Sequence, residues 1–154
     1  MIQTLSLLIV LITLLVLSWI DYKTFRLPDS ITLPLLSYGL IGNGFDFLHW
    51  ASWDSSLLGA ILGWGSLYSL NALYKKIKGI NGVGMGDAKL LGALGALLGW
   101  QQLPYIILIA SLSGLLGGYV LLKIQHKDLN QAIPFGPFIS LGGIITLLLS
   151  LIHI

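Results

Sequence analysis

The chain has 154 residues, of which 56% are hydrophobic and only 9% are charged, and its mean hydropathy is +0.91. An ordinary soluble domain carries about a quarter charged residues, so this composition excludes a soluble globular protein and indicates a membrane protein. A net charge of +2 is too small to indicate a nucleic-acid-binding protein, and a chain without cysteine has neither disulfides nor a thiolate metal site.

Apolar segments of roughly membrane-spanning size follow one another along the chain. They cover residues 2–20, 31–47, 57–74, 88–100, 103–124 and 134–152. A crossing helix needs about 20 residues. The weaker spans are therefore the short fourth segment and the second segment, which is interrupted by Gly39, Gly42, Asn43 and Gly44. The sequence therefore predicts an all-α, polytopic protein with about six transmembrane helices, folded as a single membrane-embedded domain over residues 1–154.

The basic residues give the orientation of these spans. With six spans, all of them fall in the three loops on one side: Lys23, Arg26, Lys75, Lys76, Lys78, Lys89, Lys123 and Lys127. Basic loops stay in the cytoplasm by the positive-inside rule. We therefore expect both termini on the outer side of the membrane.

The acidic residues are six aspartates, with no glutamate. Asp46 and Asp54 fall in an outer loop, and Asp128 falls in a cytoplasmic loop beside Lys127, so all three are expected to be solvated. Asp29, in LPDSIT, comes directly before the second apolar segment and is predicted to cap a helix start.

Asp21 and Asp87 are the two acids that lie at the edges of apolar segments. Asp21 follows the first segment and Asp87 precedes the fourth, so the topology puts both at the cytoplasmic face. Two carboxylates brought together share one proton, which leaves one as general base and the other as general acid for a water attacking a peptide carbonyl. The structural alternative stays open: Asp87 as a helix cap, and Asp21 as an interfacial partner of Lys23 or Arg26.

Glycines surround Asp87 in the stretch NGVGMGDAKLL. We expect Gly84 and Gly86 to belong to a shaped loop at the site, because glycine lets the backbone approach a partner closely. Gly92, Gly95 and Gly99 are predicted to form a small-residue face for helix packing.

The sequence lacks the residue patterns typical of metal sites and nucleotide-binding sites. His49, His126 and His153 lie in separate segments without an H-E-x-x-H motif, and neither a dinucleotide fingerprint nor a Walker pattern is present. We therefore expect no metal site and no cofactor.

Four stretches of the sequence together resemble the type IV prepilin peptidases, a family of membrane aspartyl proteases with a G-x-G-D motif. The stretches are DYKTFRLPDSITLPLL at 21–36, GMGDAKLL at 84–91, LGALGALLGWQQLP at 91–104 and IPFGPFISLGG at 133–143. They occur in the family's order along nearly the whole chain. Asp21 and Asp87 match the two catalytic aspartates of the family, and Asp29 matches a position to which we assign no role.

The resemblance implies an aspartic-type endopeptidase of the bacterial inner membrane, with its active site facing the cytoplasm. Its expected substrates are type IV prepilins or type II secretion pseudopilins, cleaved after a glycine between a basic leader and an apolar helix. The larger members of the family carry a four-cysteine region associated with N-methylation. This chain starts at the first peptidase helix and has no cysteine, so we expect a peptidase without methyltransferase activity.

Two other functions fit the same helices. Paired acids on short, glycine-interrupted helices also suit a small cation carrier or channel. However, the spans contain few polar residues besides Ser and Thr, which disfavours a transport path. The third possibility is a noncatalytic pilus-assembly partner.

Overall fold

The computed structural model describes residues 1–126 and 133–152, so Lys127, Asp128 and His153 lie outside the described residues. The described part is helical and contains no strand. One α-helix overlaps each of the six predicted segments, which confirms the all-α prediction. The elements are α1 (Ile2–Thr24), α2 (Asp29–Gly44), α3 (Trp53–Lys78), α4 (Met85–Leu98), the 3₁₀-helix η1 (Trp100–Gln102), α5 (Leu103–Ile124) and α6 (Gly136–Ile152).

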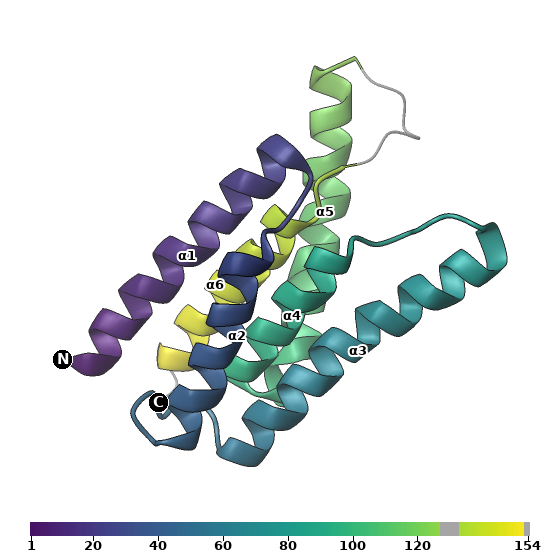
Figure 1. Cartoon of the computed structure of the whole chain (residues 1–154). Coiled ribbons are helices and arrows are strands. Elements are labelled where there is room, and N and C mark those ends of the chain that lie inside the picture. Colours follow the sequence, from purple (N-terminus) through teal and green to yellow (C-terminus); the bar gives the residue numbers. More distant parts are fainter. Residues whose placement is uncertain (127–132, 153–154) are drawn as a thin grey trace.

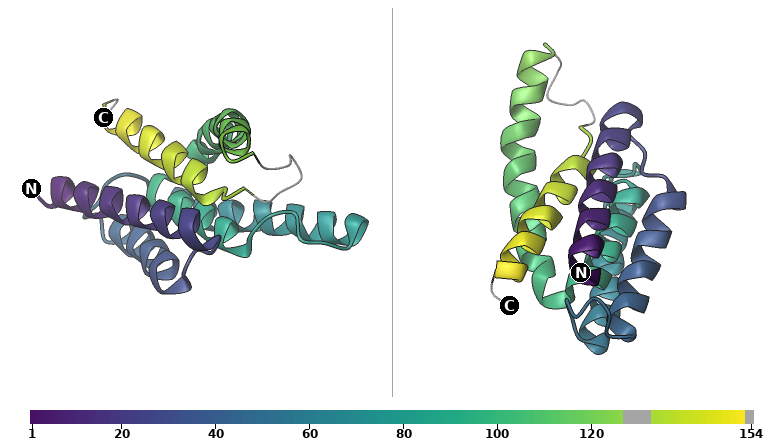
Figure 2. Two further views of the ribbon diagram at one scale, coloured as in Figure 1. Left: turned by 90° about the horizontal axis from the view of Figure 1, so that it is seen from above. Right: turned by 90° about the vertical axis from the view of Figure 1, so that its left-hand side faces the viewer.

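The helices form a bundle in which neighbours along the chain run in opposite directions (Figures 1 and 2). Both termini therefore lie at one end of the bundle, as Figure 1 shows. The opposite end collects the last turns of α1, α3 and α5 and the first turns of α2, α4 and α6. The described basic residues belong to these turns or to the links that join them, so they share one end of the bundle.

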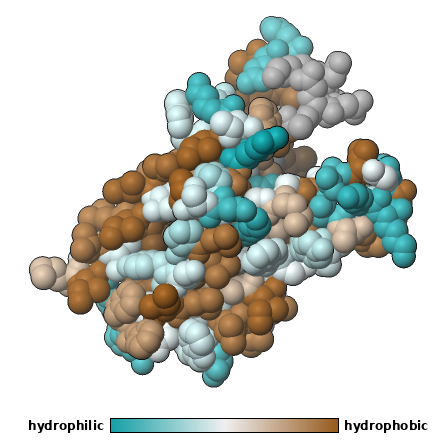
Figure 3. Space-filling view, in the orientation of Figure 1, coloured by the Kyte–Doolittle hydropathy of each residue, from teal (hydrophilic) through white to brown (hydrophobic). Residues whose placement is uncertain are grey.

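Three helical stretches are long and apolar enough to cross a membrane: α1, α3, and the stretch Trp100–Ile124 that joins η1 to α5. Helix α6 is apolar but shorter, with 17 residues. Large apolar side chains lie exposed along the sides of these helices, and Figure 3 shows apolar surface over much of the bundle. Such a surface is stable in contact with lipid rather than water, so the fold is that of a membrane protein.

Helix α4, with 14 residues, lies inside the bundle rather than against lipid. Eleven of its residues are buried, and it packs against α2, α3 and α6. A helix that is apolar all round is stable only when other helices surround it. The predicted weakness of the fourth segment as a membrane span therefore reflects its enclosed position.

Small residues let α3 and α4 approach closely. A Cβ atom on Gly59 would collide with the backbone carbonyl of Gly95, and one on Gly95 would collide with that of Gly59. A Cβ on Gly92 would lie 3.2 Å from the carbonyl oxygen of Ala60. The predicted packing face is thus confirmed for Gly92 and Gly95. Gly99 ends α4 with a φ of +86° and belongs to the same face, because a Cβ on it would collide with Oγ of Ser55 on α3.

A buried amide joins helix ends at the end of the bundle where α4 finishes. The side-chain N–H₂ of Asn43 donates to the carbonyls of Ala96 (3.0 Å) and Leu97 (2.9 Å) at the end of α4. Its Oδ1 accepts from the N–H groups of Trp50 and Ala51, both at 3.2 Å. Asn43, expected from the sequence as an interruption of the second segment, thus satisfies backbone groups at buried helix ends.

Candidate active site

Asp21 lies in the last turn of α1 and is 5% exposed. Its Oδ2 accepts a hydrogen bond of 2.9 Å from the backbone N–H of Gly136, the first residue of α6. Lys23 lies 5.1 Å above the Trp19 ring, and no ion pair joins Asp21 to a basic side chain in residues 1–126 or 133–152. The alternative of Asp21 as an interfacial partner of Lys23 or Arg26 is therefore wrong, because its carboxylate faces the start of α6.

Asp87 is the third residue of α4 and is 8% exposed. Gly84 is the N-cap residue of that helix, and the Asp87 carboxylate interacts with the Gly84 backbone. An acid in the first turn of a helix is stabilised by the partial positive charge of the helix N-terminus. Asp87 thus contributes to the helix start, as the structural alternative proposed, while its carboxylate also borders a cavity.

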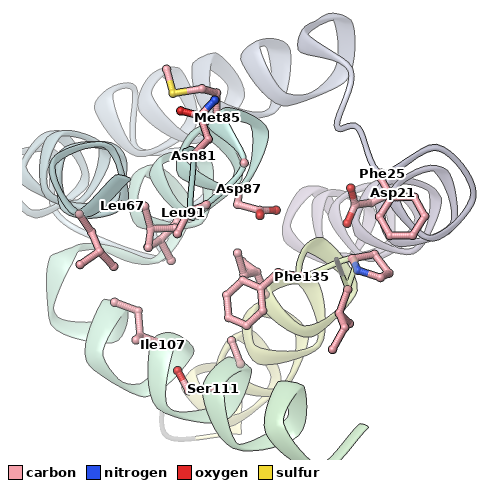
Figure 4. Close-up of a pocket in the computed structure, with 18 residues that line it drawn as sticks. Asp21, Phe25, Leu67, Asn81, Met85, Asp87, Leu91, Ile107, Ser111 and Phe135 are labelled. Atoms are coloured by element: carbon pink, nitrogen blue, oxygen red, sulfur yellow. The ribbon is translucent and has the colours of Figure 1, made fainter. Parts of the chain in front are cut away.

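The two aspartates line the same cavity, which has a volume of about 680 Å³. Figure 4 shows both carboxylates at its edge, with Asp87 coming from α4 and Asp21 from α1. They are close enough for their charges to interact. The rest of the lining is mostly apolar and comes from α3, α4, α5 and the residues before and within α6, including Leu67, Leu91, Ile107 and Phe135.

The two glycines predicted for a site loop occupy different environments. Gly84 lines the cavity, and a Cβ added to it would lie 3.3 Å from Oδ2 of Asp87. Gly86 lies within the first turn of α4, so its placement in a loop was wrong. A Cβ on Gly86 would lie 2.7 Å from Cβ of Leu27, which indicates that this glycine lets α4 pack against the link between α1 and α2.

Asn71 holds the segment that leads into Asp87, and the sequence reasoning missed it. Its buried Oδ1 on α3 accepts from the N–H groups of Gly82 (2.9 Å) and Val83 (3.1 Å). A single amide within the apolar stretch 57–74 was the available signal, since a buried polar group needs partners. The contact anchors the glycine-rich link to α3.

Asp29 does not cap α2, so that prediction was wrong. Pro28 is the N-cap residue of α2 and Asp29 is its first helical residue. Both carboxylate oxygens of Asp29 accept from the Lys89 ammonium at 2.7 Å. Asp29 therefore links the start of α2 to the first turn of α4, two residues after Asp87.

Comparison with known proteins identifies the family. Residues 8–119 match the type IV leader peptidase family. The chain belongs to this family. The resemblance noted from the sequence is thereby confirmed, and the matched region includes both Asp21 and Asp87.

Several relatives of the leader peptidase family are similar over most of the chain. A prepilin leader peptidase/N-methyltransferase of Pseudomonas aeruginosa is 45% identical over 135 residues, which cover 88% of this chain and 46% of the relative. One from Aeromonas hydrophila is 41% identical over 148 residues, covering 94% of this chain and 49% of the relative. The chain thus spans about half the length of these relatives. No solved structure matches it with significance.

Proposed function

We propose that this protein is a prepilin peptidase, an aspartic endopeptidase that removes the leader of type IV prepilins or type II secretion pseudopilins. The observation that carries the proposal is the shared cavity of Asp21 and Asp87 in a chain of the leader peptidase family. The relatives' names include both a leader peptidase and an N-methyltransferase activity. We propose the peptidase activity for this chain, and the absence of methylation stays a prediction.

In the proposed mechanism, Asp21 and Asp87 bind one water and share one proton. The ionised carboxylate takes a proton from the water as its oxygen attacks the scissile carbonyl carbon. The protonated carboxyl group stabilises the oxygen of the tetrahedral intermediate, and a proton passes to the leaving nitrogen as the C–N bond breaks. The products are a leader with a new C-terminal carboxylate and a mature pilin with a new N-terminal amine.

The proposed placement is the bacterial inner membrane, with six spans and the aspartates at the cytoplasmic face. The support is that the described basic residues lie at the same end of the bundle as Asp21 and Asp87. The short helices α2 and α4 complete the six spans, and neighbouring helices enclose α4. Fusing a reporter to each terminus and to the α1–α2 link tests this orientation, which predicts outer termini and an inner link.

Incubation of the purified protein in detergent with a full-length type IV prepilin tests the function. We expect a product shortened by the leader, and sequencing of its new N-terminus locates the cleaved bond. A carrier or channel, or a noncatalytic assembly partner, leaves the prepilin at full length. Full-length prepilin after incubation with correctly folded protein would therefore contradict the proposal.

A further inference from the structure

An apolar groove runs between α3 and α5. Helix α3 packs along α4 and touches η1, whereas α5 packs mainly along α6, so the two helices leave space between them. Beside the cavity that holds the aspartates lies a second one of about 570 Å³, lined by residues of α3, η1 and α5. Ile107 and Ser111 of α5 line both cavities. The two cavities therefore form one groove, which we call the α3/α5 groove.

Each wall of the α3/α5 groove is a row of residues four positions apart. Leu62, Ser66 and Leu70 form the row on α3, and Leu103, Ile107 and Ser111 form the row on α5. Residues at this spacing lie on one face of a helix and form a ridge along it. Ridges of this kind interdigitate with the side chains of another helix.

We propose that the α3/α5 groove receives the apolar helix of the polypeptide substrate, with the end of that helix at the aspartates. This inference rests on the proposed peptidase function and names the route by which the substrate reaches the site. Both walls belong to helices long and apolar enough to cross a membrane. An occupant at that depth must be apolar and must satisfy its own backbone groups, as a helix does.

Two features favour a helix over a lipid chain. Each wall includes a serine, Ser66 or Ser111, and small residues allow a second helix to approach closely within a membrane. The groove also continues into the cavity of Asp21 and Asp87. A lipid tail offers no peptide bond there, whereas a polypeptide helix lying in the groove places the residues before its first turn beside the two acids.

Cysteine crosslinking tests the proposal, because the chain has no cysteine of its own. Two matched pairs of neighbouring residues are available. Leu62 lines the groove and is 48% exposed, whereas Ile61 is 59% exposed and lines neither cavity. Ser111 and Leu112 form the same kind of pair on α5. Neighbours along a helix differ by about 100° in direction but hardly in depth, so each control shares the membrane depth of its partner.

The four single-cysteine variants are made in the Asp87→Asn protein, so that bound prepilin stays uncleaved. Each variant is expressed in membranes with a type IV prepilin that carries one cysteine in its apolar helix, and is then oxidised. We expect crosslinks to the prepilin from Leu62→Cys and Ser111→Cys, and few or none from Ile61→Cys and Leu112→Cys. Equal crosslinking from both members of each pair, or crosslinking only between copies of this chain, would contradict binding of the substrate helix in the α3/α5 groove.

A filling substitution gives an independent measurement. Trp in place of Ser111 occupies the groove, so we expect Ser111→Trp to lower kcat/KM for full-length prepilin about tenfold or more, mainly through KM. Leu112→Trp places the same ring outside both cavities and should leave kcat/KM nearly unchanged. Equal effects of the two substitutions on kcat/KM would contradict binding of the substrate helix in the groove. Cleavage by the unsubstituted protein tests the peptidase function separately. If that protein cleaves prepilin but the two Trp variants behave alike, the groove proposal is wrong and the peptidase function stands.

Discussion

The backbone N–H of Gly136 donates a 2.9 Å hydrogen bond to Oδ2 of Asp21, although 115 residues separate them in the sequence. This contact joins the last turn of α1 to the first residue of α6. A Cβ atom on Gly136 would lie 2.6 Å from the same oxygen and 2.9 Å from Cγ of Asp21. Glycine at this position therefore lets α6 begin directly against the carboxylate and orient it.

Substitution of Gly136 should lower the cleavage rate more than it lowers the free energy of unfolding. Gly136→Ala pushes the Asp21 carboxylate from its position, and a displacement of about 1 Å can cost about a hundredfold in rate. Gly143→Ala is the matched control on α6, because its Cβ would lie 2.6 Å from a methyl of Leu94 rather than from the carboxylate. We expect Gly143→Ala to lower stability by about 1–3 kcal/mol and to keep its cleavage rate per folded molecule. Equal cleavage by the two variants would contradict the positioning role of Gly136.

The ion pair between Asp29 and Lys89 should stabilise the first turn of α4. Lys89 is 19% exposed and Asp29 is 56% exposed, so we expect a coupling free energy of about 0.2–1 kcal/mol. A double-mutant cycle with Asp29→Asn and Lys89→Met measures it. We expect each single substitution to lower the cleavage rate, and the exchanged pair, Asp29→Lys with Lys89→Asp, to recover part of that loss. Strictly additive effects of the two single substitutions would show that the pair does not couple α2 to α4.

Loss of the Asn71 amide should loosen the link before α4. Asn71→Leu leaves the N–H groups of Gly82 and Val83 without their acceptor, at a cost of about 1–3 kcal/mol for each group that stays buried. We expect faster hydrogen exchange in residues 81–84 and a lower cleavage rate. Ser69→Ala, on the same helix, removes a hydroxyl that bonds only to carbonyls of α3 and should change neither. Unchanged exchange in Asn71→Leu would contradict this anchoring.

The close contact between α3 and α4 should tolerate no side chain. Gly95→Ala introduces a Cβ that collides with the backbone of Gly59, so we expect a loss of at least about 1–3 kcal/mol in the free energy of unfolding. Gly65→Ala on α3 meets nothing within 4 Å and should raise stability by about 0.4–1 kcal/mol. Unfolding in detergent by a denaturant measures both. Similar stability of the two variants would contradict the close approach of the helices.

The sequence predicted the parts of this fold that depend on composition and order. Long apolar runs locate the helices, and their alternation puts Asp21 and Asp87 at one end, because consecutive membrane helices reverse direction. The partners of the polar groups were not predictable in this way. Asp29 meets Lys89 across 60 residues, and Asp21 meets Gly136 across 115. Neither separation corresponds to the repeat of a helix. Helix-capping preferences, which consider only neighbouring residues, therefore assigned Asp29 to an N-cap and gave no sign of the contact with Gly136.

The enclosed position of α4 explains a further difference. Its apolar residues and glycines resemble a short membrane span in sequence, but neighbouring helices cover most of them. Hydropathy measures the preference of a segment for an apolar environment and does not distinguish lipid from protein. Gly86 was misplaced for a related reason, since a glycine-rich stretch resembles a loop even where the helix has already started.

Cleavage of a type IV prepilin by the Asp21→Asn and Asp87→Asn proteins tests the central claim most directly. The amide is nearly the same size as the carboxylate but supplies neither the base nor the shared proton. We expect both variants to insert in the membrane and fold as the unsubstituted protein does, and to leave the prepilin at full length. Cleavage by either variant at the unsubstituted rate would contradict the two-aspartate mechanism.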